Sequence, residues 1–155
     1  MTSGLRTARL LALAVPAGLL AGAYVGELVF SLYPCEMCWW QRWPHFAALA
    51  LAAAAFVLPR PRWWVRLAAL AILMSGVIGA FHAGVEYHWW QGITGCAQTT
   101  SASGGSALDA VISAPLVRCD QAPWSLLGVS LAGWNFLIST AAGFLVLWLS
   151  RERKA

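Results

Sequence analysis

Four long apolar segments, separated by short polar stretches, dominate the sequence. They cover approximately residues 10–32, 40–58, 64–87 and 123–150, and each is near the roughly 20 residues that a helix needs to cross a membrane. Pro59 and Pro61 end the second segment, because proline cannot continue a helix. Pro123 suits the first turn of the fourth helix. The pattern predicts an all-α membrane protein, a four-transmembrane-helix bundle that forms a single domain over residues 1–155.

The first segment also has some features of a cleaved signal peptide. Arg6 and Arg9 precede it, and small residues follow at 21–23. However, the apolar run continues to about residue 32, which is longer than the roughly 7–15 apolar residues of a signal peptide. The sequence therefore favours a first helix that is retained.

Composition supports a membrane environment. Hydrophobic residues make up 60% of the chain and charged residues only 10%, whereas soluble domains carry about 25% charged residues. The mean hydropathy is +0.67. The net charge of +4 does not indicate a nucleic-acid partner, because the basic residues form no patch with interleaved aromatic residues.

The basic residues predict the orientation of the helices. If the four segments alternate in direction, eight basic residues fall on one side and only Arg42 and Arg118 on the other. The positive-inside rule then places both termini in the cytoplasm. Two outer loops follow, at about residues 33–39 and 88–122, and they contain all four cysteines. The eight basic residues are Arg6, Arg9, Arg60, Arg62, Arg66, Arg151, Arg153 and Lys154.

Two local patterns predict details of packing. Ser106 and Asp109 resemble a helix capping box in the second outer loop, which predicts either a short amphipathic helix on the membrane surface or a helical turn packed against the loop. Gly18, Gly22 and Gly26 are spaced for close helix contact. Packing within the bundle is the first interpretation of this stripe, and homodimerisation is the second.

Cys35 and Cys38 form a Cys-x-x-Cys motif in the first outer loop. A c-type haem requires histidine directly after the motif, where this chain has Trp39. A structural zinc site needs four ligands, usually as two close pairs, whereas Cys96 and Cys119 are far apart and no histidine follows at ligand spacing. The sequence thus predicts no metal site.

The surroundings of Cys38 favour redox chemistry. Cys38 lies at the expected N-terminus of the second helix, where free N–H groups and the helix dipole stabilise an anion. Arg42 follows four residues later on the same helix face. Both features favour the thiolate, which is the nucleophilic form of cysteine. Arg42 could instead extend to the membrane interface for its own hydration.

The motif Cys-x-x-Cys-x-x-x-Arg at the start of the second of four transmembrane helices resembles the DsbB family of bacterial inner-membrane disulfide-generating oxidoreductases. The stretch "CDQAPWSLLGVSLAGW" resembles the family's entry into the fourth helix through Trp124, Gly128 and Trp134. The likeness extends from the first helix to the last. It implies an enzyme that oxidises a DsbA-like periplasmic thioredoxin-fold protein and passes the electrons to ubiquinone or menaquinone.

The resemblance also implies a role for each cysteine. The partner's thiolate would attack Cys96 of a Cys96–Cys119 disulfide and form a transient mixed disulfide. Cys119 would then exchange with Cys35, which leaves Cys38 as a thiolate beside the quinone. The cofactor-binding residues implied are Cys38, Arg42 and His82, of which His82 resembles a family position next to the quinone.

Other polar residues also lie near the outer face. His82 and Glu86 lie one helical turn apart, so His82 either binds quinone or is satisfied by Glu86 or a helix carbonyl. Glu27 is expected to pair with Arg42 or His45, and His45 is expected to be structural. Glu36 stands between the two cysteines where the family would lead us to expect an apolar residue, so it should oppose thiolate formation and tune the redox potential.

Three alternative functions remain at this stage. A DsbB paralogue dedicated to one client fits the same residues. A vitamin K epoxide reductase-like enzyme usually has its loop cysteines before the Cys-x-x-Cys motif, which is the reverse of the order here. A non-catalytic scaffold stapled by two disulfides would not need Arg42 in register with Cys38.

Overall fold

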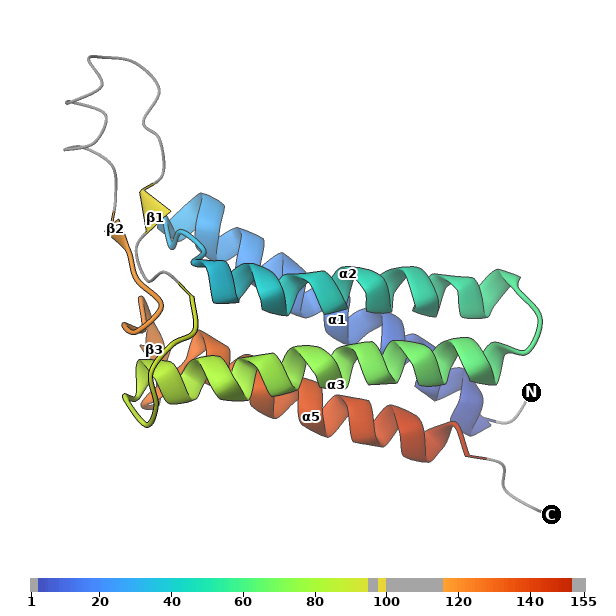
Figure 1. The fold of residues 1–155 in the computed structure, drawn as a ribbon. Helices are drawn as coiled ribbons and strands as arrows, with labels where there is room; N and C mark the ends of the chain where they lie inside the picture. The colour runs from blue at the N-terminus through green and yellow to red at the C-terminus, as the bar shows by residue number, and fades with distance from the viewer. Residues whose placement is uncertain (1–2, 95–97, 100–115, 152–155) are drawn as a thin grey trace.

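The computed structural model describes residues 3–94, 98–99 and 116–151. Four helices form an elongated bundle (Figure 1): α1 Ser3–Phe30, α2 Glu36–Val57, α3 Pro61–Glu86 and α5 Leu131–Leu149. The described strands lie at one end of the bundle, and the start of α1 and the end of α5 lie at the other. The predicted all-helical architecture is thereby confirmed. The short helix expected near residue 106 lies outside the described residues.

Local sequence signals set the helix boundaries. Cys35 caps α2, because its Sγ accepts a hydrogen bond from the backbone N–H of Cys38. Pro61 occupies the first turn of α3, where its missing N–H is not needed. Ser130 caps α5, and its Oγ accepts from the Gly133 N–H at 3.1 Å.

The fourth helix begins at Leu131 rather than near Pro123, because a small hairpin precedes it. Strands β3 Ser125–Leu126 and β4 Val129–Ser130 pair antiparallel, and Gly128 forms their turn with φ +76°, which favours glycine. Tyr87 at the end of α3 donates from its hydroxyl to the Gly128 carbonyl at 2.9 Å. A second short pair, β1 Gln98–Thr99 with β2 Leu116–Val117, holds the described parts of the second loop together.

The helices pack unequally. Helix α3 lies in the middle of the main contacts, with α2 on one side and α5 on the other, whereas α1 packs less extensively. At Gly79 of α3, an added Cβ would lie 2.9 Å from the Ala132 carbonyl oxygen, so glycine is needed for this close approach. In contrast, a Cβ at Gly18 or Gly22 of α1 would have no neighbour within 4 Å. The expectation that the α1 glycines serve close packing within the bundle is therefore wrong for these two positions.

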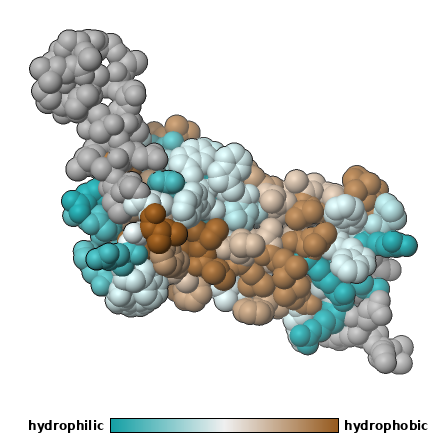
Figure 2. All heavy atoms as spheres, viewed as in Figure 1, coloured by the Kyte–Doolittle hydropathy of each residue, from teal (hydrophilic) through white to brown (hydrophobic). Residues whose placement is uncertain are grey.

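The surface has the distribution expected of a membrane protein. Figure 2 shows hydrophobic residues over the middle of the bundle and hydrophilic residues toward its ends. Within the described residues, α1, α3 and α5 are long and apolar enough to cross a membrane. Helix α2 is not one of these three, and its first turns carry Gln41, Arg42 and His45. That α2 also spans the membrane stays a prediction.

Candidate redox site

The Cys-x-x-Cys motif lies at the N-terminus of α2 with its two sulfurs facing each other. The Sγ atoms of Cys35 and Cys38 are 2.9 Å apart, and Cys35 Sγ also accepts from the Cys38 backbone N–H at 3.3 Å. A disulfide bond is about 2.05 Å long, so a sulfur movement of roughly 1 Å would join them. The pair is geometrically able to cycle between dithiol and disulfide.

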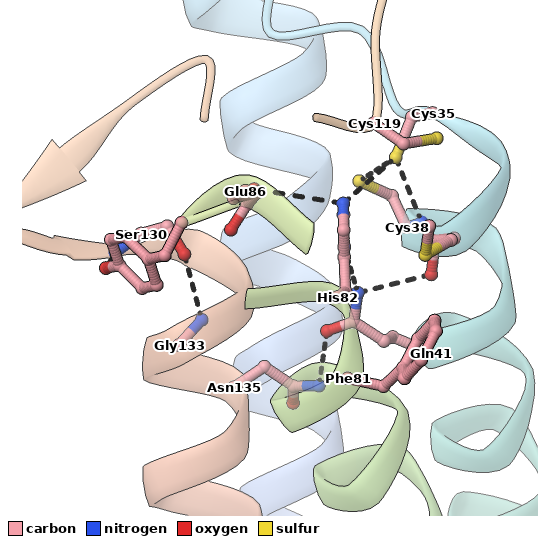
Figure 3. A network of polar contacts seen from close by, with 12 residues as sticks. Cys35, Cys38, Gln41, Phe81, His82, Glu86, Cys119, Ser130, Gly133 and Asn135 are labelled. Atoms are coloured by element: carbon pink, nitrogen blue, oxygen red, sulfur yellow. Dashed lines mark hydrogen bonds and ion pairs between the residues drawn. The ribbon is translucent and has the colours of Figure 1, made fainter. Parts of the chain in front are cut away.

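Cys119 lies beside this pair although it is far away in the sequence. It is buried in one apolar cluster with Cys35, Met37 and Val85, and Figure 3 shows its side chain next to both α2 cysteines. The Thr94 hydroxyl is 3.5 Å from its sulfur. The second loop therefore brings a third thiol to the redox pair, as thiol–disulfide exchange requires. Cys96 lies outside the described residues.

His82 reaches the pair from α3. Its Nε2 lies 3.6 Å from Cys35 Sγ and 3.8 Å from Glu86 Oε1, while its Nδ1 lies 2.8 Å from Gln41 Nε2. His82 and Glu86 are both buried. The structure thus places His82 directly against the redox sulfur of Cys35.

A network of polar side chains continues from His82 between the helices, and the sequence analysis missed most of it. Gln41 Oε1 accepts from Asn135 Nδ2 at 2.8 Å. His45 Nε2 contacts Asn135 Oδ1 at 3.0 Å and Ser75 Oγ at 2.9 Å. The signal that could have found Gln41, Ser75 and Asn135 is their polarity within otherwise apolar segments, which marks functional candidates in membrane helices.

Arg42 is held in a buried position next to the pair. Its Nη1 donates to Glu27 Oε2 at 2.7 Å, and its side chain is only 7% exposed. The guanidinium also lies 4.8 Å from the ring centres of Tyr24 and Trp39, a cation–π distance. The predicted pairing of Glu27 with Arg42 is confirmed. This burial does not fit the alternative in which Arg42 extends to the interface for hydration.

Two cavities meet at Cys38. The larger one, about 580 Å³, is mostly apolar and runs along the glycine stripe of α1; Cys38, Arg42 and Asn135 are among its polar lining residues. The smaller one, about 290 Å³, is lined by Cys35, Cys38, His82 and Glu86 on one side and by the loop around Arg118 on the other. Cys38 lines both cavities, whereas Arg42 lines only the larger and His82 only the smaller.

The chain matches known proteins over most of its length. The family profile of the disulfide bond formation protein DsbB matches residues 5–149. The chain belongs to the DsbB family. Disulfide bond formation protein B of Verminephrobacter eiseniae is 33% identical over 93% of this chain and 84% of the relative. The protein of that name from Marinobacter nauticus is 29% identical over 78% of this chain and 77% of the relative. No solved structure matches significantly.

Membership in the DsbB family supports an oxidoreductase role in disulfide bond formation. The three apolar helices fit a multi-pass membrane protein. The chemistry of such an enzyme requires one cysteine of the motif to be the better thiolate. The hydrogen bond with the Cys38 sulfur, followed by burial, raises the pKa of the Cys35 thiol. Cys35 thus holds its proton in the reduced pair, in agreement with the sequence-based choice of Cys38 as the thiolate.

The candidate site also contains a cluster with the chemistry of metal ligands. The Sγ atoms of Cys35 and Cys38 and one ring nitrogen of His82 all lie within 4.8 Å of one another. Spacing along the chain does not reveal this cluster, because His82 comes from another helix. Whether the cluster could bind a metal depends on which imidazole nitrogen carries the proton, since only a nitrogen without a proton can be a ligand.

Proposed function

We propose that this chain oxidises a DsbA-like periplasmic thioredoxin-fold protein and passes the electrons through two cysteine pairs to membrane quinone. The observation that carries the proposal is the position of Cys38 between two unlike cavities. One cavity faces the loop that carries Cys119, and the other is large, apolar and bordered by Arg42. A Cys35–Cys38 pair in this place can exchange with the loop cysteines through Cys35 on one side and meet a lipid-soluble acceptor through Cys38 on the other.

The loop side would carry the thiol–disulfide exchange. A partner thiolate attacks Cys96 of the Cys96–Cys119 disulfide, and the bond to Cys119 breaks. The Cys119 thiolate then attacks Cys35 of the Cys35–Cys38 disulfide, so that Cys38 leaves as a thiolate with the bonding electron pair. The burial of Cys119 in the same apolar cluster as Cys35 supports this step, since no large movement is needed to bring the sulfurs together.

The apolar side would hold the quinone. The large cavity suits a lipid-soluble ring and tail because its walls are mostly apolar, and Arg42 adds a buried cation at its edge. Bound quinone would supply the two-electron acceptor that a thiol pair lacks. Arg42 would stabilise negative charge that develops near Cys38. His82 remains a predicted quinone-binding residue, although it lines the smaller cavity and contacts Cys35.

The proposed location is the bacterial inner membrane, with four transmembrane helices, both termini in the cytoplasm and the redox site on the periplasmic face. The charge asymmetry of the sequence supports this orientation. The described strands and the start of α2, which carries the redox motif, lie at the same end of the bundle, and this is consistent with the proposed orientation.

The test uses the purified full chain in lipid, with ubiquinone or menaquinone and a reduced DsbA-like protein as substrates. We expect quinone-dependent oxidation of the partner that is lost in Cys38→Ser and in Cys96→Ser. A non-catalytic scaffold would give no turnover in the unaltered chain. Unchanged turnover in either variant would contradict the proposed path.

A further inference from the structure

Gln41 and His82 meet in a buried contact that has no part in the electron path described above. Gln41 Nε2 lies 2.8 Å from His82 Nδ1, on the side of the imidazole that faces away from the cysteines (Figure 3). A neutral imidazole carries its proton on one nitrogen only, and the partner of the other nitrogen decides which. The orientation of the Gln41 amide therefore has a chemical consequence at Cys35.

The Gln41 amide is oriented by groups other than His82. Its Nε2 lies 3.2 Å from the main-chain carbonyl oxygen of Met37, and a carbonyl can only accept, so this atom must be the NH₂ group. Its Oε1 accepts from Asn135 Nδ2 at 2.8 Å. Rotating the amide by half a turn would break both hydrogen bonds. It would place the Gln41 oxygen against the Met37 carbonyl oxygen, and the Gln41 NH₂ group against the Asn135 NH₂ group, in a buried site.

Asn135 is fixed in the same way by a second main-chain carbonyl. Its Nδ2 lies 3.2 Å from the Ser75 carbonyl oxygen, which again can only accept. Its Oδ1 accepts from the Ser139 hydroxyl at 2.9 Å. The orientation of both amides thus follows from two backbone carbonyls, without any assumption about the histidine.

We propose that Gln41 is a positioning residue that fixes His82 as the Nε2–H tautomer and so directs a hydrogen-bond donor at Cys35. Because Gln41 donates to Nδ1, Nδ1 must be the bare nitrogen and the proton sits on Nε2. The Nε2–H then faces Cys35 Sγ at 3.6 Å and Glu86 Oε1 at 3.8 Å, and the main chain of Cys119 lies on the same side of the ring. The first distance is within reach for a large sulfur acceptor, and the second is too long for an N–H···O bond.

The His82 Nε2–H would stabilise the Cys35 thiolate that forms when a disulfide to Cys35 breaks. This role rests on the proposed function. In the regenerating exchange, the partner's second thiolate first attacks the partner sulfur of the mixed disulfide and releases Cys96 as a thiolate. The Cys96 thiolate then attacks Cys119 of a Cys35–Cys119 disulfide. One S–S bond forms, one breaks, and Cys35 leaves as a thiolate with the electron pair. The leaving sulfur is the one that His82 Nε2–H contacts, and a better-stabilised thiolate leaves faster. Arg42 and the N-terminus of α2 would stabilise the Cys38 thiolate, whereas His82 would stabilise the Cys35 thiolate.

The same proton has a second effect on the site. The cluster of Cys35, Cys38 and His82 has metal-ligand chemistry, but a protonated Nε2 cannot coordinate a metal. Gln41 therefore protects the reduced pair from capture by thiol-binding ions such as Zn²⁺. A residue that only fills space between the helices would have no such effect.

The direct test is nitrogen NMR of the unaltered full chain in lipid nanodiscs, with ¹⁵N-labelled histidine. The chain contains 3 histidines, so the spectrum of His82→Phe identifies the His82 signals. We expect the one-bond ¹⁵N–¹H coupling at Nε2 and none at Nδ1. A proton on Nδ1 in the unaltered chain overturns the proposal, and this result does not depend on turnover.

Gln41→Met keeps the length of the side chain and removes the donor. We expect a mixture of His82 tautomers, a kcat for partner oxidation lower by about tenfold, equivalent to roughly 1.4 kcal/mol of barrier, and inhibition by Zn²⁺ at a lower concentration. Ser139→Ala is the matched control, because Ser139 contacts Asn135 but neither Gln41 nor His82 in any described hydrogen bond. It should retain the tautomer, kcat and Zn²⁺ response.

Gln41 also lines the large cavity, so the kinetic test must separate positioning from quinone binding. A raised KM for quinone with unchanged kcat and an unchanged tautomer in Gln41→Met would overturn the positioning role. An equal tautomer shift in Ser139→Ala would do the same. If quinone-dependent turnover is absent even in the unaltered chain, the proposed function fails, whereas the tautomer assignment is still decided by NMR.

Discussion

The two cavities that share Cys38 differ in size and in the polarity of their linings. The larger is apolar, bordered by the glycines of α1, and has Arg42 as its buried cation. The smaller has a mixed polar and apolar lining, borders the second loop, and includes Glu86 and His82, whose Nε2 lies 3.6 Å from Cys35 Sγ. The difference supports a division in which thiol–disulfide exchange with protein cysteines takes place on one side of the motif. Electron transfer to a lipid-soluble acceptor would take place on the other side.

The strongest test of this division is Cys119→Ser. Without Cys119 the second loop cannot pass electrons to Cys35, so we expect oxidation of the DsbA-like partner to fall below detection. Electron transfer from a small dithiol such as dithiothreitol, which can reach Cys35–Cys38 directly, should continue. Quinone reduction followed by absorbance measures both. If the variant loses the dithiothreitol reaction as well, the two sides are not separable.

Arg42→Met should weaken the opposite side. The apparent KM for quinone should rise by about tenfold or more and kcat should fall, because the buried cation beside Cys38 is lost. Mixed-disulfide formation between the partner and Cys96, followed by non-reducing gel electrophoresis, should be unchanged.

Removing one member of a buried ion pair also destabilises a protein by about 3–5 kcal/mol. Glu27→Gln in combination with Arg42→Met serves as the control, since the double variant leaves no unpaired carboxylate. Its thermal stability should exceed that of Arg42→Met alone, while its KM for quinone stays high. Recovery of KM in the double variant would contradict a direct role for Arg42.

The glycines permit a smaller and more local test of the same comparison. Gly22→Leu should fill part of the large cavity, where a Cβ has open space, and raise KM for long-tailed quinone severalfold. Gly79→Ala should instead lower stability by about 1–3 kcal/mol, because its Cβ would meet the Ala132 carbonyl oxygen at 2.9 Å. Thermal unfolding and quinone kinetics on both variants should show opposite patterns, and identical patterns would refute the distinction.

The sequence predicted the helices well because long apolar runs and prolines are local signals. It also identified Cys38 and Arg42, which lie one turn apart on one helix. It missed Gln41 and Asn135, because their partners come from other helices and spacing along the chain cannot reveal such contacts. It misjudged Gly22, since a small-residue stripe looks the same whether it faces a helix or a cavity. The hairpin before α5 was hidden by Pro123, which suits a helix start equally well.

Glu36 offers the weakest expected effect. The sequence suggested that this carboxylate tunes the redox potential, and the structure leaves it partly exposed at the start of α2, where solvent screens its charge. The pKa of Cys35 is governed by the Cys38 sulfur and by burial instead.

Removing a negative charge stabilises the reduced, thiolate-containing form, so Glu36→Gln should make the Cys35–Cys38 potential more positive. We expect a shift of less than about 30 mV, which corresponds to roughly 1.4 kcal/mol, measured by equilibration with glutathione buffers. A much larger shift, or one toward more negative potential, would contradict the conclusion that solvent screens the charge of Glu36 from the two sulfurs.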